Sequence, residues 1–423
     1  MPPPAAAATH CSFTAAVKKQ SASSNSTVYH TPEFLTEAVD MLINFDNAAT
    51  TFPKPLCVRK AVAEAMENFG GNAGRGGHPL AMRTSAALYS ARETAAGFFG
   101  ASPENVIFTM NCTYAINMAI QGIMSGGGHM IISGIEHNSA ARPAAALAAK
   151  GCITLSVAPV YADDELTAET FRSLMREDTK AVVCTLAGNV TGQIPPWKRI
   201  AALCRERDIC FIADGAQACG ILDIKMSDGI NILCTAGHKG LYGITGTGLL
   251  ITDGRYPLTP LIQGGTGSSS LSLVQPGLLP ESLESGTPCI IGAMSVKAGI
   301  DFIQKQNISR IRYHEENLCS RFISRLKGIH GAVIYRESGA AYAPVVSFNI
   351  GDIPPELLAA DLAEKGFCLR AGFHCAALAH TQLGTPNGTI RFSPAFFNTE
   401  HDVDALANSI KYVLDSEKYQ KNY

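Results

Sequence analysis

The sequence predicts an α/β protein, with a mostly parallel sheet covered by helices and a smaller α+β domain after it. From Leu42 onward, short apolar runs alternate with longer segments of helical periodicity, which is typical of parallel strands joined by crossover helices. After a stretch at 252–288 that is dense in Gly, Ser and Pro, the pattern becomes helix, strand, strand, helix, strand and helix. We therefore expect a large domain at 42–299 and a small domain at 300–423.

The individual elements follow from the same patterns. Apolar runs bounded by turn residues indicate strands, and apolar residues at helical spacing, such as Ile116, Ile120 and Ile123, indicate helices. The elements expected in the large domain are strands at Val106–Met110, Met130–Ser133, Ala181–Leu186, Ile209–Ala213 and Asn231–Cys234, and helices at Tyr114–Met124 and Trp197–Arg207. Those expected in the small domain are strands at Val345–Ile350 and Thr389–Ser393 and a helix at Ala405–Leu414.

Composition limits the kind of ligand. The formal net charge is −2 and 17% of the residues are charged, so we expect no basic surface for nucleic acid or an anionic membrane. No apolar run approaches the roughly 18 residues that a membrane span needs. The 13 cysteines include no Cys-x-x-Cys pair and no zinc-finger spacing, and Cys184, Cys210 and Cys234 lie in apolar runs typical of a core. These features favour a cytoplasmic protein with a small-molecule ligand and no metal site.

The first 41 residues differ from the rest. Up to Pro32 they are rich in Pro, Ala, Ser and Thr, with Lys18 and Lys19 as the only charged side chains, which predicts a disordered extension. A targeting segment is the alternative, but the stretch has no Arg, and His10 and Cys11 interrupt its apolar part.

Polar candidates for a site come directly after the predicted strands. Thr113, His137, Asn189, Asp214 and Lys239 each follow or end a strand. Because ligands of open parallel sheets bind beyond the carboxyl ends of the strands, we expect these side chains to converge.

Lys239 is the strongest candidate. Gly237, Gly240 and Gly243 bracket it, which indicates a close backbone approach rather than an ordinary surface lysine. A lysine that attacks an aldehyde must be partly neutral, and burial beside His238, taken as a cation, would lower its pKa.

Asp214 ends an apolar run, where an unpaired carboxylate is costly. Its partner could be a protonated pyridine nitrogen, and Gln217 could then donate to the ring hydroxyl; equally, Asp214 could be a helix N-cap. The residues Asn111–Thr113 lie between a strand and a helix, where backbone N–H groups favour a phosphate, although any capped helix looks similar. His137 could stack on a ring and move protons, or be structural.

Cys375 lies in a loop, unlike the core cysteines. We expect it to be exposed, with Arg370 and His374 as cations that favour its thiolate. Arg370 and Arg391 flank this loop and need anionic partners, which could be a substrate carboxylate or, especially for Arg391, an internal Asp or Glu. An amine, a carboxylate and a thiol of this kind are the groups with which a pyridoxal phosphate (PLP) enzyme moves sulfur.

From Asn44 to the C-terminus the chain also resembles the cysteine desulfurases of the class V aminotransferase family, and most closely the Suf-type group that includes selenocysteine lyases. The resemblance is carried by Asn44–Thr51, Arg75–His78, Glu136–Ser139, Asp214–Gln217, Gly237–Lys239, Glu284–Pro288 and Arg370–Ala376.

The resemblance implies fold type I of the PLP enzymes, with a seven-stranded sheet, and a role for each matching residue. It implies that Lys239 binds the cofactor aldehyde, that His137 stacks on the ring, that Asp214 and Gln217 hold its nitrogen and hydroxyl, and that Thr113, Cys112 and His238 form the phosphate end. Thr287 would reach the phosphate of a neighbouring subunit, which implies a homodimer. Asn189, Arg370 and Arg391 would face the substrate, and Cys375 would be the persulfide-forming nucleophile.

The chain departs from the family at four positions. Ala236 stands where many relatives have a phosphate-binding Ser, Cys112 where Thr or Ser is common, and Phe373 where His is frequent, while Gly240 lengthens the lysine loop. The implied function is conversion of L-cysteine to L-alanine with an enzyme-bound persulfide, passed to an acceptor protein for iron–sulfur cluster or thio-cofactor synthesis. Alternatives are a selenocysteine lyase, a cysteine sulfinate desulfinase, another class V aminotransferase or epimerase, and a non-enzymatic sulfur-relay scaffold.

Overall fold

The computed structural model describes residues 42–74 and 76–420. The extension at 1–41, for which the sequence predicts disorder, lies outside the described residues, as does Arg75 of the second motif. No helix in the described part of the chain is long and apolar enough to cross a membrane.

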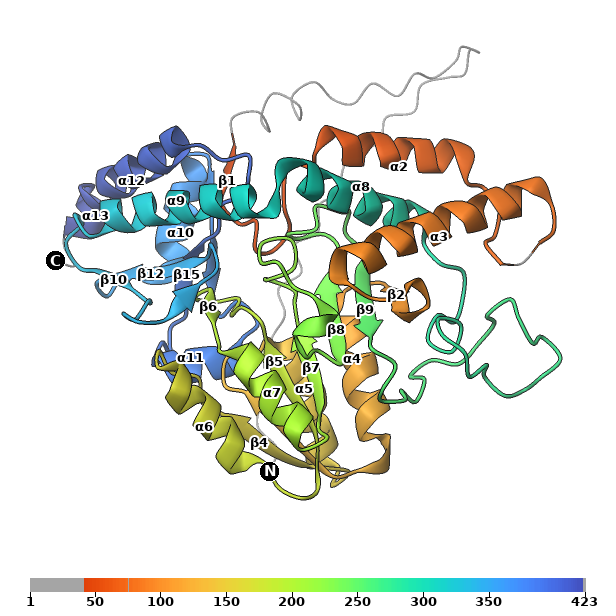
Figure 1. Ribbon diagram of the computed structural model, residues 1–423. Helices are drawn as coiled ribbons and strands as arrows, with labels where there is room; N and C mark the ends of the chain where they lie inside the picture. The colour runs from red at the N-terminus through yellow and green to blue at the C-terminus, as the bar shows by residue number, and fades with distance from the viewer. Residues whose placement is uncertain (1–41, 75, 421–423) are drawn as a thin grey trace, which may run out of the picture. The chain divides into compact units, whose positions relative to one another are not determined.

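A seven-stranded sheet forms the centre of the larger part of the fold, in the order β2-β9-β8-β7-β5-β3-β4 (Figure 1). Its strands are β2 (Val106–Thr109), β3 (His129–Ser133), β4 (Thr154–Ala158), β5 (Thr179–Thr185), β7 (Cys210–Asp214), β8 (Ile232–Ala236) and β9 (Gly248–Thr252). Six strands run in one direction and β9 runs antiparallel to both of its neighbours. The predicted mostly parallel α/β sheet is therefore confirmed.

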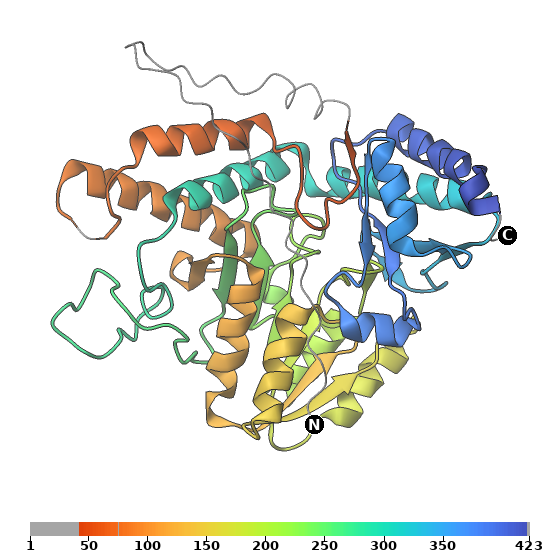
Figure 2. The same ribbon diagram turned by 180° about the vertical axis from the view of Figure 1, so that it is seen from behind.

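Helices cover both faces of this sheet because its strands are apolar on both sides. One face packs on α4 (Cys112–Ile123) and α5 (Asn138–Ala149), which lie in front of the strands in Figure 2. The helices of the other face are α3 (Pro79–Phe99), α6 (Asp164–Leu174), α7 (Trp197–Glu206) and α8 (Ile290–Gln306), with α2 (Leu56–Asn68) packed on α8. Alternate residues of one strand point to opposite faces of the sheet. Ile212 of β7 lies in the core beneath α4 and α5, whereas Phe211 and Ala213 lie in the core of the opposite face.

Local sequence explains where several helices begin and end. Asn111 caps α4 by accepting from the Tyr114 N–H at 2.9 Å, and Asp163 caps α6 through the N–H groups of Glu165 and Leu166. Gly100 ends α3 in the left-handed conformation that favours glycine, with φ of 69°.

The C-terminal part contains a second, four-stranded sheet in the order β10-β12-β15-β14. Its strands are β10 (Ala332–Ile334), β12 (Val346–Ile350), β14 (Arg370–Gly372) and β15 (Thr389–Phe392), and they pack with α9 (Ile308–Leu326), α10 (Pro355–Glu364) and α12 (Glu400–Leu414). Short elements complete the chain: β1 (Ile43–Asn44), β6 (Gln193–Ile194), β11 (Ala341–Tyr342), β13 (Phe367–Cys368), α11 (Ala377–Leu383) and α13 (Glu417–Gln420). β1 pairs with β13, so the start of the described chain belongs to this part. The division at residue 300 remains a prediction.

A long connection between β9 and α8 contains no helix or strand among its described residues, as the sequence predicts. It projects away from the sheet in Figure 1. Its apolar side chains Leu271, Leu273, Val274 and Leu278 are largely exposed.

Candidate active site

Most of the predicted site residues lie at or just beyond the carboxyl ends of the parallel strands, and Arg370 and Arg391 lie on the second sheet. Asp214 ends β7 and is opposite Thr185 of β5 and Cys234 of β8 in the strand register. Lys239 follows β8, and its charge interacts with those of Asp214 and of Arg370 and Arg391, which face each other on β14 and β15. Residues of both parts of the chain therefore lie close enough to Lys239 for their charges to affect its pKa.

The backbone of Lys239 is fixed from two sides. Its carbonyl accepts hydrogen bonds from Thr51 Oγ1 at 2.8 Å and from the Tyr242 N–H at 2.9 Å. Gly240, the residue that lengthens this loop, lies so close to the turn at Gly220 that a Cβ on Gly220 would be 2.1 Å from the Gly240 carbonyl oxygen. Burial lowers the pKa of Lys239, while Cys112 and Asp214 oppose the change. The amine is thus easier to deprotonate than an ordinary lysine, which suits a nucleophile.

His238 does not contribute to this shift as a cation, which corrects the expectation from the sequence. Burial, together with the charges of Lys239 and Lys54, lowers the pKa of His238 to about 4, so the ring is neutral near pH 7. Its Nδ1 is buried without a hydrogen-bond partner among the described residues.

Asp214 is 2% exposed, and burial raises the pKa of its carboxyl. The two hydrogen bonds that this side chain accepts from described residues both end on Oδ1, from the Ala216 N–H at 2.9 Å and from Cys112 Sγ at 3.6 Å. No helix begins here, because the chain after Asp214 forms turns, so the alternative of a helix N-cap is wrong. Oδ2 is left to pair with a cationic donor in the crevice.

His137 caps α5 and is oriented by that role. Its Nδ1 accepts from the Ser139 N–H at 3.0 Å, which leaves Nε2 as the free ring nitrogen. Burial first, then the charges of Lys239, Arg370, Arg391 and Arg142, lower its pKa to about 4. A neutral ring at physiological pH can lie against a flat ligand, and its Nε2, which carries the ring proton when Nδ1 accepts, can donate a hydrogen bond.

Cys375 is exposed, as expected, and its backbone is held in an unusual conformation. His374 and Cys375 both have positive φ, 48° and 55°, although neither is glycine. The Cys375 carbonyl accepts from the Asn138 N–H at 2.7 Å, and the His374 carbonyl accepts from Asn189 Nδ2 at 2.7 Å. Arg370 Nη2 lies 3.7 Å from the Cys375 sulfur. These contacts fix the thiol beside one cation.

His374 is not the second cation, contrary to the expectation. It is 2% exposed, its Nε2 contacts the carbonyl and hydroxyl oxygens of Thr389 at 3.0 Å each, and burial lowers its pKa to about 2. A histidine in such surroundings stays neutral and anchors the loop instead.

Arg391 has an internal partner, the option that the sequence left open for it. Its Nη2 lies 2.7 Å from Asp46 Oδ1, its Nη1 donates to the Asn189 carbonyl at 3.0 Å, and its Nε has no partner among the described residues. The side chain is 1% exposed. Asp46 was missed by the sequence reasoning, although it belongs to the first motif of the resemblance.

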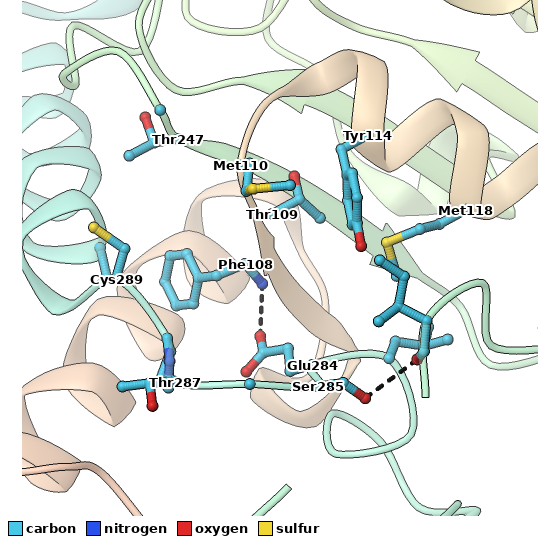
Figure 3. Close-up of a pocket in the computed structure, with 16 residues that line it drawn as sticks. Phe108, Thr109, Met110, Tyr114, Met118, Thr247, Glu284, Ser285, Thr287 and Cys289 are labelled. Atoms are coloured by element: carbon cyan, nitrogen blue, oxygen red, sulfur yellow. Dashed lines mark hydrogen bonds between the residues drawn. The ribbon is translucent and has the colours of Figure 1, made fainter. Parts of the chain in front are cut away.

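The remaining predicted residues are less closely gathered. Thr113 is exposed in the first turn of α4, and Gln217 Nε2 donates to the Ala48 carbonyl at 2.9 Å. Thr287 lies apart from the crevice, in a pocket of about 220 Å³ that it shares with Glu284 and Cys289 (Figure 3). The pocket that contains Lys239 and Gln217 is a different one. Within one chain, therefore, Thr287 is not part of the Lys239 site.

Glu136 is a buried carboxyl that the sequence reasoning did not single out. Its Oε1 accepts from Ser133 Oγ and from the Thr185 N–H, both at 2.6 Å, while Oε2 is buried without a partner among the described residues. Burial, with the nearby charge of Asp214, raises its pKa to about 8. Glu136 ties the turn before His137 to β3 and β5.

The residues present fit a PLP group. The charge of Lys239, whose pKa is lowered, interacts with buried Asp214 and with the neutral His137, and the N-terminus of α4 meets Asp214 through Cys112. Among the described residues there is no group of three or more His, Cys, Asp or Glu arranged to hold a metal ion.

Comparisons with known proteins agree with this arrangement. The family described as aminotransferase class-V matches residues 43–406. A probable cysteine desulfurase of Methanothermobacter thermautotrophicus is 31% identical over 380 residues, which cover 87% of this chain and 94% of that protein. One of Halalkalibacterium halodurans is also 31% identical over 380 residues, covering 88% and 92% of the two chains.

Solved structures agree as well. The apo cysteine desulfurase of Thermococcus onnurineus NA1 superposes with a TM-score of 0.83 and is 27% identical, covering 92% of this chain and 99% of that one. The cysteine desulfurase CsdA of Escherichia coli has a TM-score of 0.80 and is 26% identical, covering 89% and 95%. The chain belongs to the class-V aminotransferase family, among the cysteine desulfurases.

Proposed function

We propose that this protein is a PLP-dependent cysteine desulfurase that converts L-cysteine to L-alanine and carries the sulfur as a persulfide on Cys375. The observation that supports this most is the combination of Lys239, of lowered pKa, with Asp214 at the inner end of the crevice and exposed Cys375 beside Arg370 at its edge. An aminotransferase needs the first two residues but has no use for a thiol fixed at the site.

The reaction balances without an added oxidant. The Cys375 thiolate attacks the sulfur of bound cysteine, a sulfur–sulfur bond forms, and the carbon–sulfur bond breaks with its electron pair on carbon. Protonation of that carbon gives alanine, so that cysteine and the enzyme thiol become alanine and the enzyme persulfide. PLP, when bound, supplies an electron sink for the carbanion that forms at the α-carbon.

The chain's own residues bind, orient and move protons in this scheme. Lys239 is the group that takes the α-proton, because it is the amine of this site whose pKa is lowered. Asp214 Oδ2 would hold the ring nitrogen, Gln217 the ring hydroxyl, and His137 would lie against the ring. Arg370 lies beside the Cys375 sulfur and would orient it towards the substrate.

Substrate recognition is assigned to Asn189, Arg370 and Arg391. Arg391 would bind the substrate carboxylate through its Nε, which has no partner in the described residues, while Asp46 and the Asn189 carbonyl keep its other nitrogens in place. Asn189 has a buried side-chain oxygen without a partner that could accept from the substrate.

The phosphate end of the site is assigned to the start of α4 and to a second subunit. Thr113 lies in the first turn of that helix, and His238 has a buried ring nitrogen free to contact a phosphate. Because Thr287 lies apart from Lys239 within one chain, its implied contact requires a homodimer. The exposed Leu271, Leu273, Val274 and Leu278 offer an apolar surface for such an interface.

We further propose that the persulfide passes to an acceptor protein in the cytoplasm, for iron–sulfur cluster or thio-cofactor synthesis. Exposure of Cys375 supports transfer to a partner, since a buried persulfide could not be reached. Selenocysteine is the alternative substrate.

The test is product analysis of the purified protein with cysteine and a reductant. Wild type should be yellow and form alanine and sulfide in equal amounts. Lys239→Ala should be inactive, and Cys375→Ala should stay yellow but lose cysteine turnover. Cys152→Ala, which removes another exposed thiol, is the matched control and should behave like wild type. Full cysteine activity in Cys375→Ala would contradict the persulfide mechanism, and activity with selenocysteine alone would identify the lyase.

A further inference from the structure

We propose that Cys112 is a positioning residue of the cofactor site, whose thiol holds Oδ1 of Asp214 and thereby reserves Oδ2 for the cofactor's ring nitrogen. The inference rests on the proposed function in one respect, since it takes PLP as the cofactor. It assigns Cys112 to the inner end of the site, where it contacts Asp214, rather than to the phosphate.

The geometry of Cys112 supports a directed contact. It is the first residue of α4, and the Asn111 cap fixes where that helix begins. The side chain is buried, and its sulfur lies 3.6 Å from Asp214 Oδ1, within hydrogen-bonding range for sulfur. Oδ1 also accepts from the Ala216 N–H at 2.9 Å, whereas Oδ2 accepts nothing from the described residues. Two donors on one oxygen oppose rotation of the carboxylate about its last bond.

The direction of the hydrogen bond follows from the charges around it. Burial raises the pKa of Cys112 well above its ordinary value, and Asp214 and Cys234 raise it further, while Lys239 opposes the change. The sulfur therefore keeps its proton and is the donor. Glu136 is the other carboxyl that interacts with Asp214, and its own pKa is raised. Of Cys112, Glu136 and Asp214, Asp214 is thus the one that should carry a negative charge when a cationic partner is bound.

This contact also affects how well Asp214 binds a cation. Burial raises the pKa of Asp214, and the hydrogen bonds from Ala216 and Cys112, together with Lys239, act against that rise. Removal of the thiol would leave the carboxyl easier to protonate and free to rotate, and both changes weaken its hold on a protonated ring nitrogen. A hydroxyl in place of the thiol would be a stronger donor and would keep the carboxylate charged.

The experiment measures cofactor binding rather than turnover. Apoenzyme of wild type, Cys112→Ala, Cys112→Ser and Cys204→Ala is titrated with PLP, and the absorbance of the bound cofactor gives Kd and the pH midpoint of its visible band. Cys204 is a fully buried thiol on α7 and serves as the control for removing a core sulfur. Thermal unfolding of each apoprotein establishes that it is folded.

We expect Cys112→Ala to bind PLP about three- to tenfold more weakly than wild type. The pH midpoint of the visible band should also be lower, because Asp214 would hold the protonated ring nitrogen less firmly. Cys112→Ser and Cys204→Ala should bind within about twofold of wild type. Equal Kd and midpoint for wild type and Cys112→Ala, or equal weakening by Ala and Ser, would overturn the role of Cys112 as a donor. A wild-type protein that binds no PLP would instead overturn the proposed function itself.

Discussion

The ion pair between Arg92 and Glu284 should be the strongest charge coupling in the described chain. Both side chains are nearly buried, at 6% and 12% exposure, and they form two parallel contacts of 2.8 Å each. Arg92 also donates to the Val106 carbonyl, and Glu284 accepts from the Phe108 N–H at 2.6 Å (Figure 3). The pair joins α3 and β2 to the segment that carries Thr287.

Removal of one member leaves the other charge buried without its partner, which costs about 3–5 kcal/mol. We therefore expect Arg92→Met and Glu284→Gln each to lower the free energy of unfolding by about 3 kcal/mol. The double variant should lose about 3–4 kcal/mol rather than the sum of the two, because neither charge is then left unpaired, which gives a coupling energy of about 2–3 kcal/mol.

Urea unfolding followed by far-ultraviolet circular dichroism measures these values, provided that the slope with denaturant is unchanged. The control is the pair of Arg199 and Glu165, which is 57% and 79% exposed and should give a coupling energy below about 1 kcal/mol. If the two single changes in the buried pair add to within about 0.5 kcal/mol, Arg92 and Glu284 are not energetically coupled.

Three further predictions concern the pH dependence of stability, the cysteine loop and the subunit contact. The pKa of Glu136 is raised from 4.5 to about 8 in the fold, so its contribution to stability is present below pH 4.5 and is lost as pH rises through 8. Glu136→Gln should remove this pH-dependent loss, which is at most about 5 kcal/mol. Equal unfolding midpoints of the wild-type protein between pH 5 and 8.5 would contradict the raised pKa. His374→Gln should lose the contact with Thr389, lower cysteine turnover about tenfold and leave PLP absorbance unchanged; unaltered turnover would show that His374 does not position Cys375. Leu271→Ser with Leu273→Ser should shift the sedimentation of the protein towards the monomer, because both side chains are fully exposed in one chain, and an unchanged distribution would place the subunit contact elsewhere.

Much of the fold could be predicted because its strands carry their own signal. The five strands expected in the large domain are all present, with ends that differ by one or two residues, since a continuous apolar run fits only a strand buried on both faces. β9 was not predicted. Its antiparallel direction could not be predicted either, because the direction of a strand depends on the connection that leads into it and not on its apolar residues. The helices α2 and α3 were missed because they precede the first clear strand.

The candidate site likewise contains features that the sequence predicted and features that it did not. The sequence placed Lys239, Asp214 and His137 at or after the carboxyl ends of strands, and the structure has each of them there; their roles stay predictions. The charge states of His238 and His374 were predicted wrongly, since a sequence contains neighbours along the chain but not burial, and burial is the first cause of both lowered pKa values.

The available reactive groups can be read from the amino-acid sequence, namely the amine of Lys239 and the thiol of Cys375, and so can the order of motifs that marks the family. Which groups meet, and in which protonation state, depends on how the chain packs in three dimensions. It paired Arg391 with Asp46 across 345 positions of sequence, placed the Cys112 thiol on Asp214, and separated Thr287 from Lys239 within one chain. The physical reason is that removal from water, and the exact partner found there, set the energy of a charge, and both arise only when distant segments pack together.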